Sequence, residues 1–179
     1  MERVRLLIFL NWAVRGGVEE VALALAKGLD RSRFETHLAA PRPLLDSFTP
    51  DLAGSPVRTL PIQLTSFRQW RDMWKLAAYL RQHRIQIVNP HRFYATLFAA
   101  PLARLAGVPV VIETTHGREA WRRSWWKRTY WIDRLVERLV TLNVSVSEAN
   151  REYLALEKGY PRRKLHVIPN GRDLACYAA

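Results

Sequence analysis

The sequence predicts an α/β domain built on a doubly wound, mainly parallel sheet with helices on both faces. Apolar runs rich in Val, Ile and Leu recur at regular distances, and most are continuous, as in strands that a parallel sheet buries on both faces. Helical patterns lie between most of these runs, which is the order expected of a parallel sheet. Gly28, Gly107 and Gly159 stand where the helical patterns stop and support the same organisation.

The expected elements follow the chain in a regular order. The predicted strands span residues 4–10, 35–40, 57–62, 85–89, 108–114, 139–146 and 165–168. The predicted helices span residues 18–29, 68–83, 94–105, 121–138 and 148–158, and Ser147 is expected to cap the last of them. Residues 42–56, RPLLDSFTPDLAGSP, are typical of a loop with at most one short helical turn.

Length and charge limit the possible classes of protein. With 179 residues and a mass of 20.8 kDa, the chain is long enough for one domain over residues 1–179, or for half of a two-domain protein. Its formal net charge of +12 and its pI near 10.7 attract polyanions. Nucleic acid, anionic lipid headgroups and phosphorylated substrates are the partners that this charge alone leaves open.

The amino-terminal segment and the cysteine content bear on location. The start MERVRLLIFLNW has a short apolar run with no small-residue cleavage site after it, so it predicts a first strand and not a secretory signal. Cys176 is single and has no internal disulfide partner. No apolar segment reaches the roughly 18 to 20 residues of a membrane-spanning helix. A soluble chain in the cytoplasm is therefore expected.

A pair of glycines separates the first predicted strand from the first helix, in the segment NWAVRGGVEEVALALAKGL. In an open parallel sheet this turn often meets a phosphate at the positive end of the helix. Gly16 and Gly17 let backbone N–H groups approach an anion without an intervening Cβ, and Arg15 adds a cation. A tight turn without any ligand is the alternative interpretation of the pair.

Two histidines follow other strands at the same edge of the predicted sheet. His91 and Arg92 come after IQIVNP, and Thr115 and His116 end the run VPVVIETTH. Histidine there could bond a sugar hydroxyl or stabilise phosphate charge, because its protonation state is adjustable near neutral pH. Taken singly, each is more typical of a structural or surface histidine.

Several common catalytic patterns are absent from the sequence. It contains neither GxGxxG nor GxxxxGK[ST] after the first strand, which disfavours a dinucleotide dehydrogenase and a P-loop nucleotidase. It also lacks the DxD, CxxC, HExxH and GxSxG patterns, so metal-dependent hydrolysis and a serine nucleophile lose their usual support. We expect neither a metal nor a cofactor.

Four segments, in this order, resemble the amino-terminal half of retaining glycosyltransferases of family 4: RGGVEEVALALAKGL, VNPHRFYATLFAAPLARLAGVPVVIETTHG, VSVSEANREYL and LHVIPNGRD. The resemblance implies half of a GT-B fold, in which two Rossmann-like domains face each other across a cleft. It implies that Gly16, Gly17 and Arg15 bind the donor phosphates and that His116 contacts the donor sugar or the reacting centre. His91, Arg92 and Thr115 would contact the acceptor, and PNG at 169–171 would approach the interdomain hinge.

The chain departs from this family pattern because the carboxyl-terminal, donor-binding domain is absent from it. The family's E-x7-E motif belongs to that domain, and no two glutamates here have that spacing. The resemblance implies transfer of a sugar from a nucleotide-sugar to an acceptor hydroxyl with retention of configuration, without a metal, in the synthesis of a cell-envelope glycan or glycolipid. This chain alone would bind the donor weakly and transfer nothing.

A basic, tryptophan-rich segment, GREAWRRSWWKRTYWIDRLVERLV, predicts a helix whose core face holds Trp121, Trp125, Ile132, Leu135, Val136 and Leu139. The opposite face holds the aromatic residues Trp126 and Tyr130 among the cations Arg123, Lys127, Arg134 and Arg138. Exposed aromatics among cations are typical of a helix on an anionic membrane. This predicts a peripheral location on the inner face of the membrane; a solvated face, or one that the absent domain covers, is the alternative.

Two other functions compete with the transferase. A non-catalytic basic module could hold anionic lipid or nucleic acid, but it would have no need of Gly17, His91 and His116 at the strand ends, so we expect no specific nucleic-acid partner. A nucleotide-sugar epimerase would share the GT-B fold and would release a sugar product without an acceptor. The expected partners are therefore a nucleotide-sugar, a glycan or lipid-linked acceptor, and the absent carboxyl-terminal domain.

Overall fold

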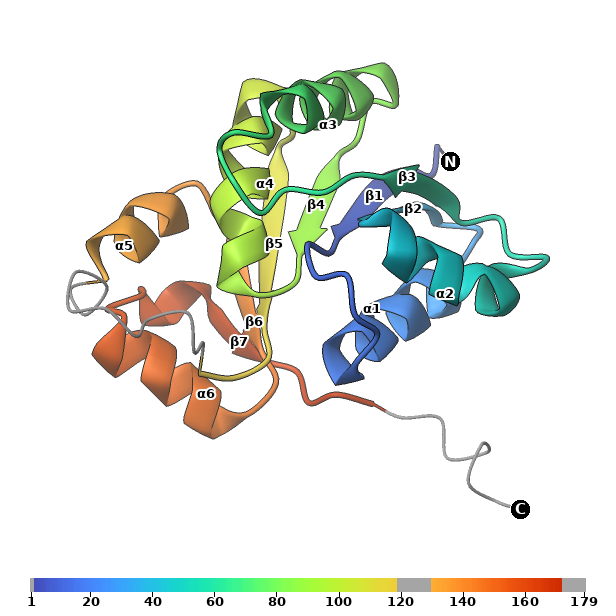
Figure 1. The fold of residues 1–179 in the computed structure, drawn as a ribbon. Helices are drawn as coiled ribbons and strands as arrows, with labels where there is room; N and C mark the ends of the chain where they lie inside the picture. Colours follow the sequence, from blue (N-terminus) through green and yellow to red (C-terminus); the bar gives the residue numbers. More distant parts are fainter. Residues whose placement is uncertain (1, 119–129, 172–179) are drawn as a thin grey trace, which may run out of the picture.

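Seven parallel strands form one sheet in the computed structural model, which describes residues 2–118 and 130–171 (Figure 1). The strands lie in the order β3-β2-β1-β4-β5-β6-β7. Their bounds are β1 (Val4–Phe9), β2 (Phe34–Ala40), β3 (Arg58–Pro61), β4 (Ile87–Pro90), β5 (Val110–Thr115), β6 (Leu142–Ser145) and β7 (Leu165–Val167). The predicted doubly wound sheet is confirmed, and every strand pair is parallel.

Helices connect the strands and cover both faces of the sheet. They are α1 (Gly17–Gly28), α2 (Arg42–Leu52), α3 (Trp70–Gln82), α4 (Phe93–Leu105), α5 (Trp131–Glu137) and α6 (Glu148–Glu152), which a π-helical turn (Tyr153–Glu157) continues. The cap predicted at Ser147 is confirmed, since its Oγ accepts a hydrogen bond from the Asn150 backbone N–H at 3.2 Å. Gly107 and Gly159 end their helices with positive φ angles of 81° and 73°.

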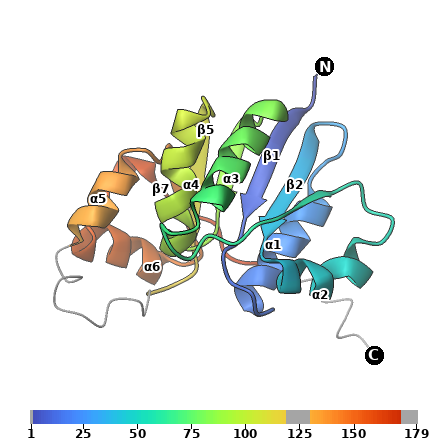
Figure 2. The same ribbon diagram turned by 45° about the horizontal axis from the view of Figure 1, so that its top comes forward.

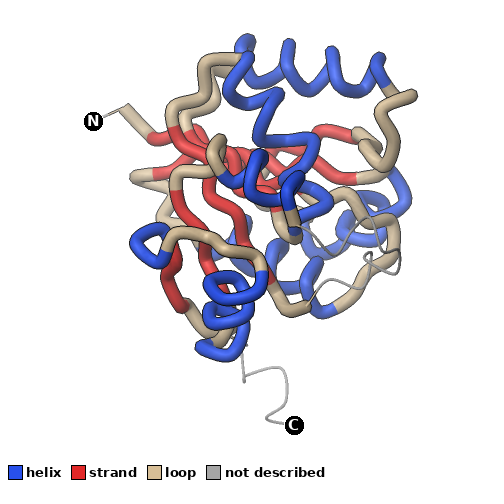
Figure 3. Tube along the Cα trace, turned by 90° about the vertical axis from the view of Figure 1, so that its left-hand side faces the viewer, coloured by secondary structure: helices blue, strands red, loops and turns tan. Residues whose placement is uncertain are grey.

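The core lies in two layers, one on each side of the sheet, and β1 contributes side chains to both layers. Leu7 and Phe9 pack in the cluster that also holds buried residues of α3 and α4. Leu6, Ile8 and Leu10 point to the other face and pack with α1 and α2. The strands accordingly lie between helices in Figure 3, and all five of these residues are buried, as the continuous apolar run predicts.

The sheet changes its winding direction between β1 and β4. After β1 the chain adds β2 and β3 on one side, and it then returns to add β4 to β7 on the other side. The connections that leave β1 and β4 therefore diverge (Figures 1 and 2). Ligands of open α/β sheets bind at such a switch point, outside the carboxyl ends of the strands.

One predicted loop is a helix. Residues 42–52 form α2, whereas the abundance of Pro, Asp and Ser predicted at most one helical turn. Pro43 stands in the first turn, where its missing N–H costs nothing. Leu44, Leu45 and Phe48 then recur at helical spacing and are buried against the sheet, so tertiary packing outweighs the weak helix propensity of the other residues.

The helix predicted for residues 121–138 is confirmed over Trp131–Glu137 and is interrupted at Tyr130. Tyr130 has left-handed backbone angles, φ 51° and ψ 16°, and α5 begins only at Trp131. A helix does not run through such a residue, so α5 begins after it. Of the residues assigned to the core face, Val136 is buried and Ile132 and Leu139 pack against the core, whereas Leu135 is exposed. Residues 119–129 lie outside the described part of the chain.

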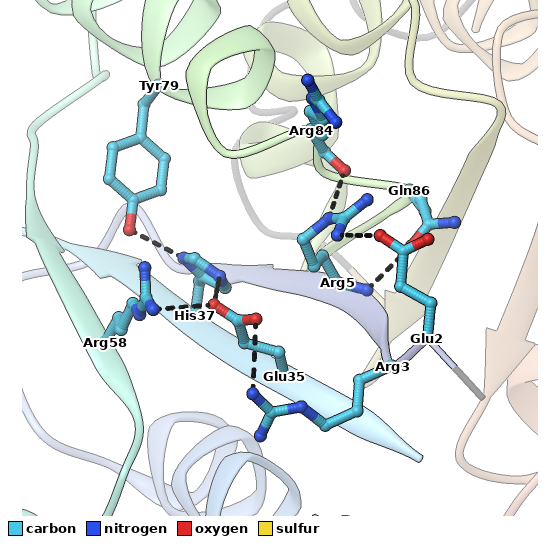
Figure 4. A network of polar contacts seen from close by, with 9 residues as sticks. All are labelled: Glu2, Arg3, Arg5, Glu35, His37, Arg58, Tyr79, Arg84 and Gln86. Atoms are coloured by element: carbon cyan, nitrogen blue, oxygen red, sulfur yellow. Dashed lines mark hydrogen bonds and ion pairs between the residues drawn. The ribbon is translucent and has the colours of Figure 1, made fainter.

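A polar network ties α3 to the sheet near the amino-terminal ends of β1 and β2 (Figure 4). His37 on β2 is fully buried, and its Nδ1 lies 2.7 Å from the Tyr79 hydroxyl of α3. The Glu35 carboxylate forms ion pairs with Arg58 at 3.2 Å and with Arg3 at 3.8 Å. Arg5 binds the Arg84 carbonyl at 2.9 Å. Because these groups lie at the edge away from the switch point, we interpret the network as structural.

Candidate functional site

Three connections meet at the carboxyl edge of the sheet beside the switch point. The glycine turn follows β1, His91 follows β4, and His116 follows β5. Backbone bonds hold these connections together: the His91 N–H donates to the Phe9 carbonyl at 3.0 Å, and the Arg92 N–H donates to the Thr114 carbonyl at 2.8 Å. The sequence therefore predicted correctly that these segments come together.

The glycine turn leaves open space at the start of α1. Gly16 caps the helix in an extended conformation, and Gly17 is the first helical residue. A Cβ built on Gly17 would meet no atom within 4 Å, and one on Gly16 would lie 3.1 Å from a carboxylate oxygen of Glu19. Neither glycine has a positive φ, so backbone strain does not account for the pair.

Arg15 does not point its charge into this space as the sequence suggested. Its guanidinium forms ion pairs with Glu20 and with Asp51, the latter at 2.7 Å, and it donates to the Ser47 carbonyl at 2.8 Å. Arg15 thus fastens the glycine turn to α2. A role on donor phosphates would need these bonds to be exchanged, and it stays a prediction.

A buried carboxylate lies beside the glycine turn and was missed by the sequence analysis. The Glu19 side chain is buried in the first turn of α1, and one oxygen lies 3.4 Å from a terminal nitrogen of Arg92. This ion pair joins the β1 connection to the β4 connection. The position of Glu19 in the sequence did not indicate a role in the site, because acidic residues are common in the first turns of helices, where they complement the helix dipole.

His91 and His116 stack at the centre of the site. Their ring centroids are 5.1 Å apart with an interplanar angle of 22°, and His91 Nδ1 lies 3.0 Å from His116 Nε2. On its other side, His91 Nε2 lies 3.2 Å from Asn89 Oδ1. His91 is fully buried, whereas His116 is partly exposed. His116 is therefore the more exposed histidine of the pair, and burial does not support the acceptor contact predicted for His91.

The network fixes where the imidazole protons lie. Asn89 Nδ2 donates to the Ile112 carbonyl at 2.6 Å and to Thr114 Oγ1 at 2.9 Å, so Asn89 Oδ1 faces His91 and accepts. His91 Nε2 must then carry the proton, and its Nδ1 accepts from His116 Nε2–H. This leaves a lone pair on His116 Nδ1, a buried atom with no hydrogen-bond partner within the described ranges 2–118 and 130–171.

Both rings are neutral around pH 7. Burial, and then the neighbouring His116 and Arg92, lower the pKa of His91 to about 3. Burial, and then Arg92, lower the pKa of His116 to about 4. The expectation of a proton exchanged near neutral pH is therefore wrong for this pair. A neutral imidazole can orient a hydroxyl through hydrogen bonds, but it brings no positive charge to a phosphate.

The same physics predicts that the chain loses stability in mild acid. Burial also lowers the pKa of His37 to about 4, so folding holds His37, His91 and His116 neutral while the unfolded chain takes up protons below about pH 6.5. Stability is thus full above pH 6.5 and falls as the pH approaches 4. We expect the free energy of unfolding to fall by about 2 kcal/mol for each of these histidines between pH 7 and pH 5. Urea unfolding at the two pH values measures this loss.

A substitution checks this origin of the acid sensitivity. The variant His37→Gln removes one of the three groups from a position away from the site, and its free energy of unfolding should depend less steeply on pH than that of the parent chain. Equal slopes for the two proteins, or a stability of the parent that does not change between pH 7 and pH 5, would contradict the assignment.

Thr115 supports the site from inside. Its side chain is fully buried, its Oγ1 lies 3.4 Å from Glu113 Oε1, and its carbonyl accepts from Asn150 Nδ2 at 2.9 Å. The predicted contact between this side chain and an acceptor is therefore not supported. Asn89 and Asn150, which the sequence analysis missed, both bond to the β5 backbone and hold the segment that ends in His116.

The predicted membrane-facing residues fall partly outside the described chain. Arg123, Trp126 and Lys127 lie among residues 119–129. Tyr130 is described and is half-buried, since it packs against the cluster of Tyr153, Leu154, Tyr160 and Leu165. Its assignment to an open aromatic face was therefore wrong. Arg134 is exposed, and its Nε donates to the Lys158 carbonyl at 2.9 Å.

Comparison with known proteins decides the family. The family model described as Glycosyltransferase Family 4 matches residues 15–175, which is nearly the whole chain. The chain belongs to glycosyltransferase family 4. The matched segment includes the glycine turn, both histidines of the stacked pair and β7, so the site described above lies within the family domain.

A curated relative is longer than this chain. The UDP-Gal:alpha-D-GlcNAc-diphosphoundecaprenol alpha-1,3-galactosyltransferase of Escherichia coli is 28% identical over 167 residues, which cover 90% of this chain and 43% of the relative. The chain thus spans less than half the length of this curated relative.

Solved structures confirm the fold. Alr3699/HepE of Anabaena in complex with UDP-glucose matches with a TM-score of 0.71 at 17% identity, over 98% of this chain and 46% of that one. UDP-GlcNAc 2-epimerase of Methanocaldococcus jannaschii matches with a TM-score of 0.66 at 15% identity, over 94% of this chain and 46% of that one. The match to an epimerase agrees with the expectation that the two classes of enzyme share this fold.

Proposed function

We propose that the chain is the acceptor-binding half of a retaining glycosyltransferase that transfers a sugar from a nucleotide-sugar to an acceptor hydroxyl. The observation that carries the proposal is the stacked His91–His116 pair beside the glycine turn at the switch point, in a chain of glycosyltransferase family 4. A carboxyl-terminal domain that this chain lacks would close the site and supply most of the donor contacts.

In this proposal the residues divide into contact and positioning groups. His116 faces the donor sugar or the reacting centre with an imidazole that is neutral at pH 7. Asn89 and His91 fix its tautomer and its orientation. Gly16 and Gly17 leave room for the donor phosphates at the start of α1. Arg92, which is half-exposed beside Glu19, is the remaining candidate for an acceptor contact.

The diphosphate must leave with its charge stabilised. Transfer with retention has a transition state of oxocarbenium character, so electrostatic support for the departing phosphate contributes more than a strong base. Neutral histidines fit a role in orienting hydroxyl groups better than a role in stabilising phosphate charge. The phosphate-binding cations are therefore expected mainly in the absent domain, and no metal is assigned to the reaction.

The acceptor is proposed to be a glycan or a lipid-linked sugar of the cell envelope. The Escherichia coli relative is named for a diphosphoundecaprenol-linked acceptor, and Alr3699/HepE was solved with UDP-glucose. The net charge of +12 is consistent with an acceptor held at an anionic membrane face. No helix among residues 2–118 and 130–171 has the length and hydropathy to cross a bilayer, and a peripheral position is proposed.

The chain by itself should not catalyse sugar transfer. Purified chain incubated with a panel of nucleotide-sugars, with and without lipid extract, is expected to release no nucleoside diphosphate, because the proposal gives most of the donor contacts to a carboxyl-terminal domain. Release by the chain alone would contradict the assignment of this half to the acceptor. Formation of a free sugar product without any acceptor, when the absent domain is added, would instead favour an epimerase.

A further inference from the structure

An exposed aromatic row runs along the start of α3. Phe67 and Trp74 are each 66% exposed and Trp70 is 58% exposed. Trp70 and Trp74 are four residues apart on one helix and therefore share a face. The adjoining face of α3 packs in the core, where Leu76, Ala77 and Leu80 are buried. The aromatic row is thus an additional apolar surface that the fold does not use.

Basic residues surround this row. Residues 63–84 contain five cations, Arg68, Arg71, Lys75, Arg81 and Arg84, and a single acid, Asp72. The Arg71 guanidinium lies 5.4 Å from the centre of the Trp70 ring. Among the described residues, none of the cations Arg68, Arg71 and Lys75 forms an ion pair with a carboxylate, so their charges are available to an anionic partner. Lys75 donates only to the Pro61 carbonyl, at 2.7 Å.

The aromatic row begins next to the candidate site. The Phe67 ring packs on Phe98 of α4 with centroids 4.9 Å apart, and the Tyr94 hydroxyl donates to the Thr65 carbonyl just before the row. Helix α4 starts directly after His91 and Arg92, and α3 and α4 are in contact and appear as neighbours in Figure 2. The row therefore extends away from the carboxyl edge at which the acceptor would be held.

We propose that Phe67, Trp70 and Trp74, flanked by Arg68, Arg71 and Lys75, dock the chain on an anionic membrane surface. Tryptophan rings favour headgroup depth, and the neighbouring cations favour anionic lipid. Charge complementarity selects a bilayer over a neutral protein partner. The docking inference rests on the proposed function only in placing the acceptor at the membrane, and it assigns that contact to α3 and to Phe67 just before it.

Vesicle binding tests the docking surface without any sugar transfer. The chain is mixed with vesicles of phosphatidylcholine, or of equimolar phosphatidylcholine and phosphatidylglycerol, and bound protein is separated by flotation. The double variant Trp70→Ala/Trp74→Ala should bind the anionic vesicles about tenfold or more weakly. Arg68→Gln/Arg71→Gln should lose about tenfold or more on anionic vesicles and little on neutral ones.

Trp131→Ala is the matched control, since Trp131 is 57% exposed on α5, away from α3. It should bind as the parent chain does. Unchanged vesicle binding by both α3 variants, or loss confined to Trp131→Ala, would overturn the proposal. So would a change in molecular mass by light scattering on Trp70→Ala/Trp74→Ala, which would identify α3 as a contact between two copies.

Failure of the docking surface is distinguishable from failure of the transferase. With the absent domain added and a water-soluble acceptor, Trp70→Ala/Trp74→Ala should release nucleoside diphosphate at the parent rate. Loss of vesicle binding together with this unchanged rate supports the docking surface, whereas an equal fall with the soluble acceptor would place α3 in the sugar-binding site and overturn it.

Discussion

Replacement of His116 by Ala is expected to lower the turnover of the assembled enzyme by about a hundredfold or more, because loss of one preorganised hydrogen-bonding group at a reacting centre costs that much. His116 is the more exposed ring of the stacked pair, and its Nδ1 lone pair has no partner within the described ranges. The measurement is release of nucleoside diphosphate by this chain combined with the absent carboxyl-terminal domain.

Two further variants show which nitrogen of His116 matters. His116→Gln keeps an N–H that can donate to His91 but has no acceptor at the Nδ1 position, so it should lose nearly as much activity as His116→Ala. His166→Ala removes an exposed histidine on β7 and should be neutral. Full activity of His116→Gln would show that the Nδ1 atom of His116 is not needed for transfer.

The second large effect concerns stability. Lys158 and Asp133 are fully buried and form an ion pair with an Nζ–Oδ1 distance of 3.0 Å. The Lys158 ammonium also lies 4.6 Å from the centre of the Phe93 ring of α4. Lys158→Ala would leave the Asp133 charge buried without this cation, so we expect the free energy of unfolding to fall by about 3–5 kcal/mol, measured with urea.

A double variant separates the buried charge from the packing. Lys158→Met with Asp133→Leu replaces both charges by apolar groups of similar size and should recover most of the lost stability, as in other buried pairs. A loss of under about 1 kcal/mol for Lys158→Ala would show that the pair contributes little. A double variant no more stable than Lys158→Ala would show that packing, and not the charge, was responsible.

The sheet and the site location were predictable because they depend on signals that are local in the sequence. Continuous apolar runs and helix-ending glycines placed the seven strands, and the alternation of strand and helix brought the glycine turn, His91 and His116 to one edge. Helix α2 was missed because its helicity comes from burial of Leu44, Leu45 and Phe48 against the sheet. Propensity alone does not contain that information.

The roles within the site depend on burial, which the sequence does not show. His91 and Thr115 were predicted to contact the acceptor, but the structure buries both side chains. The pairing of Arg15 with Glu20 and Asp51, and of Glu19 with Arg92, joins residues from separate elements. The aromatic row of α3 was visible as FRQWRDMW, yet only the structure shows that its rings stay exposed.

The most direct test of the transferase assignment is to combine the chain with the absent carboxyl-terminal domain, supply a panel of nucleotide-sugars, and follow nucleoside diphosphate release with and without lipid extract. We predict release that requires both halves, depends on an acceptor from the extract and is lost in His116→Ala. No release with any nucleotide-sugar, when both halves are folded and associated, would contradict the assignment and favour a basic module that binds without catalysis.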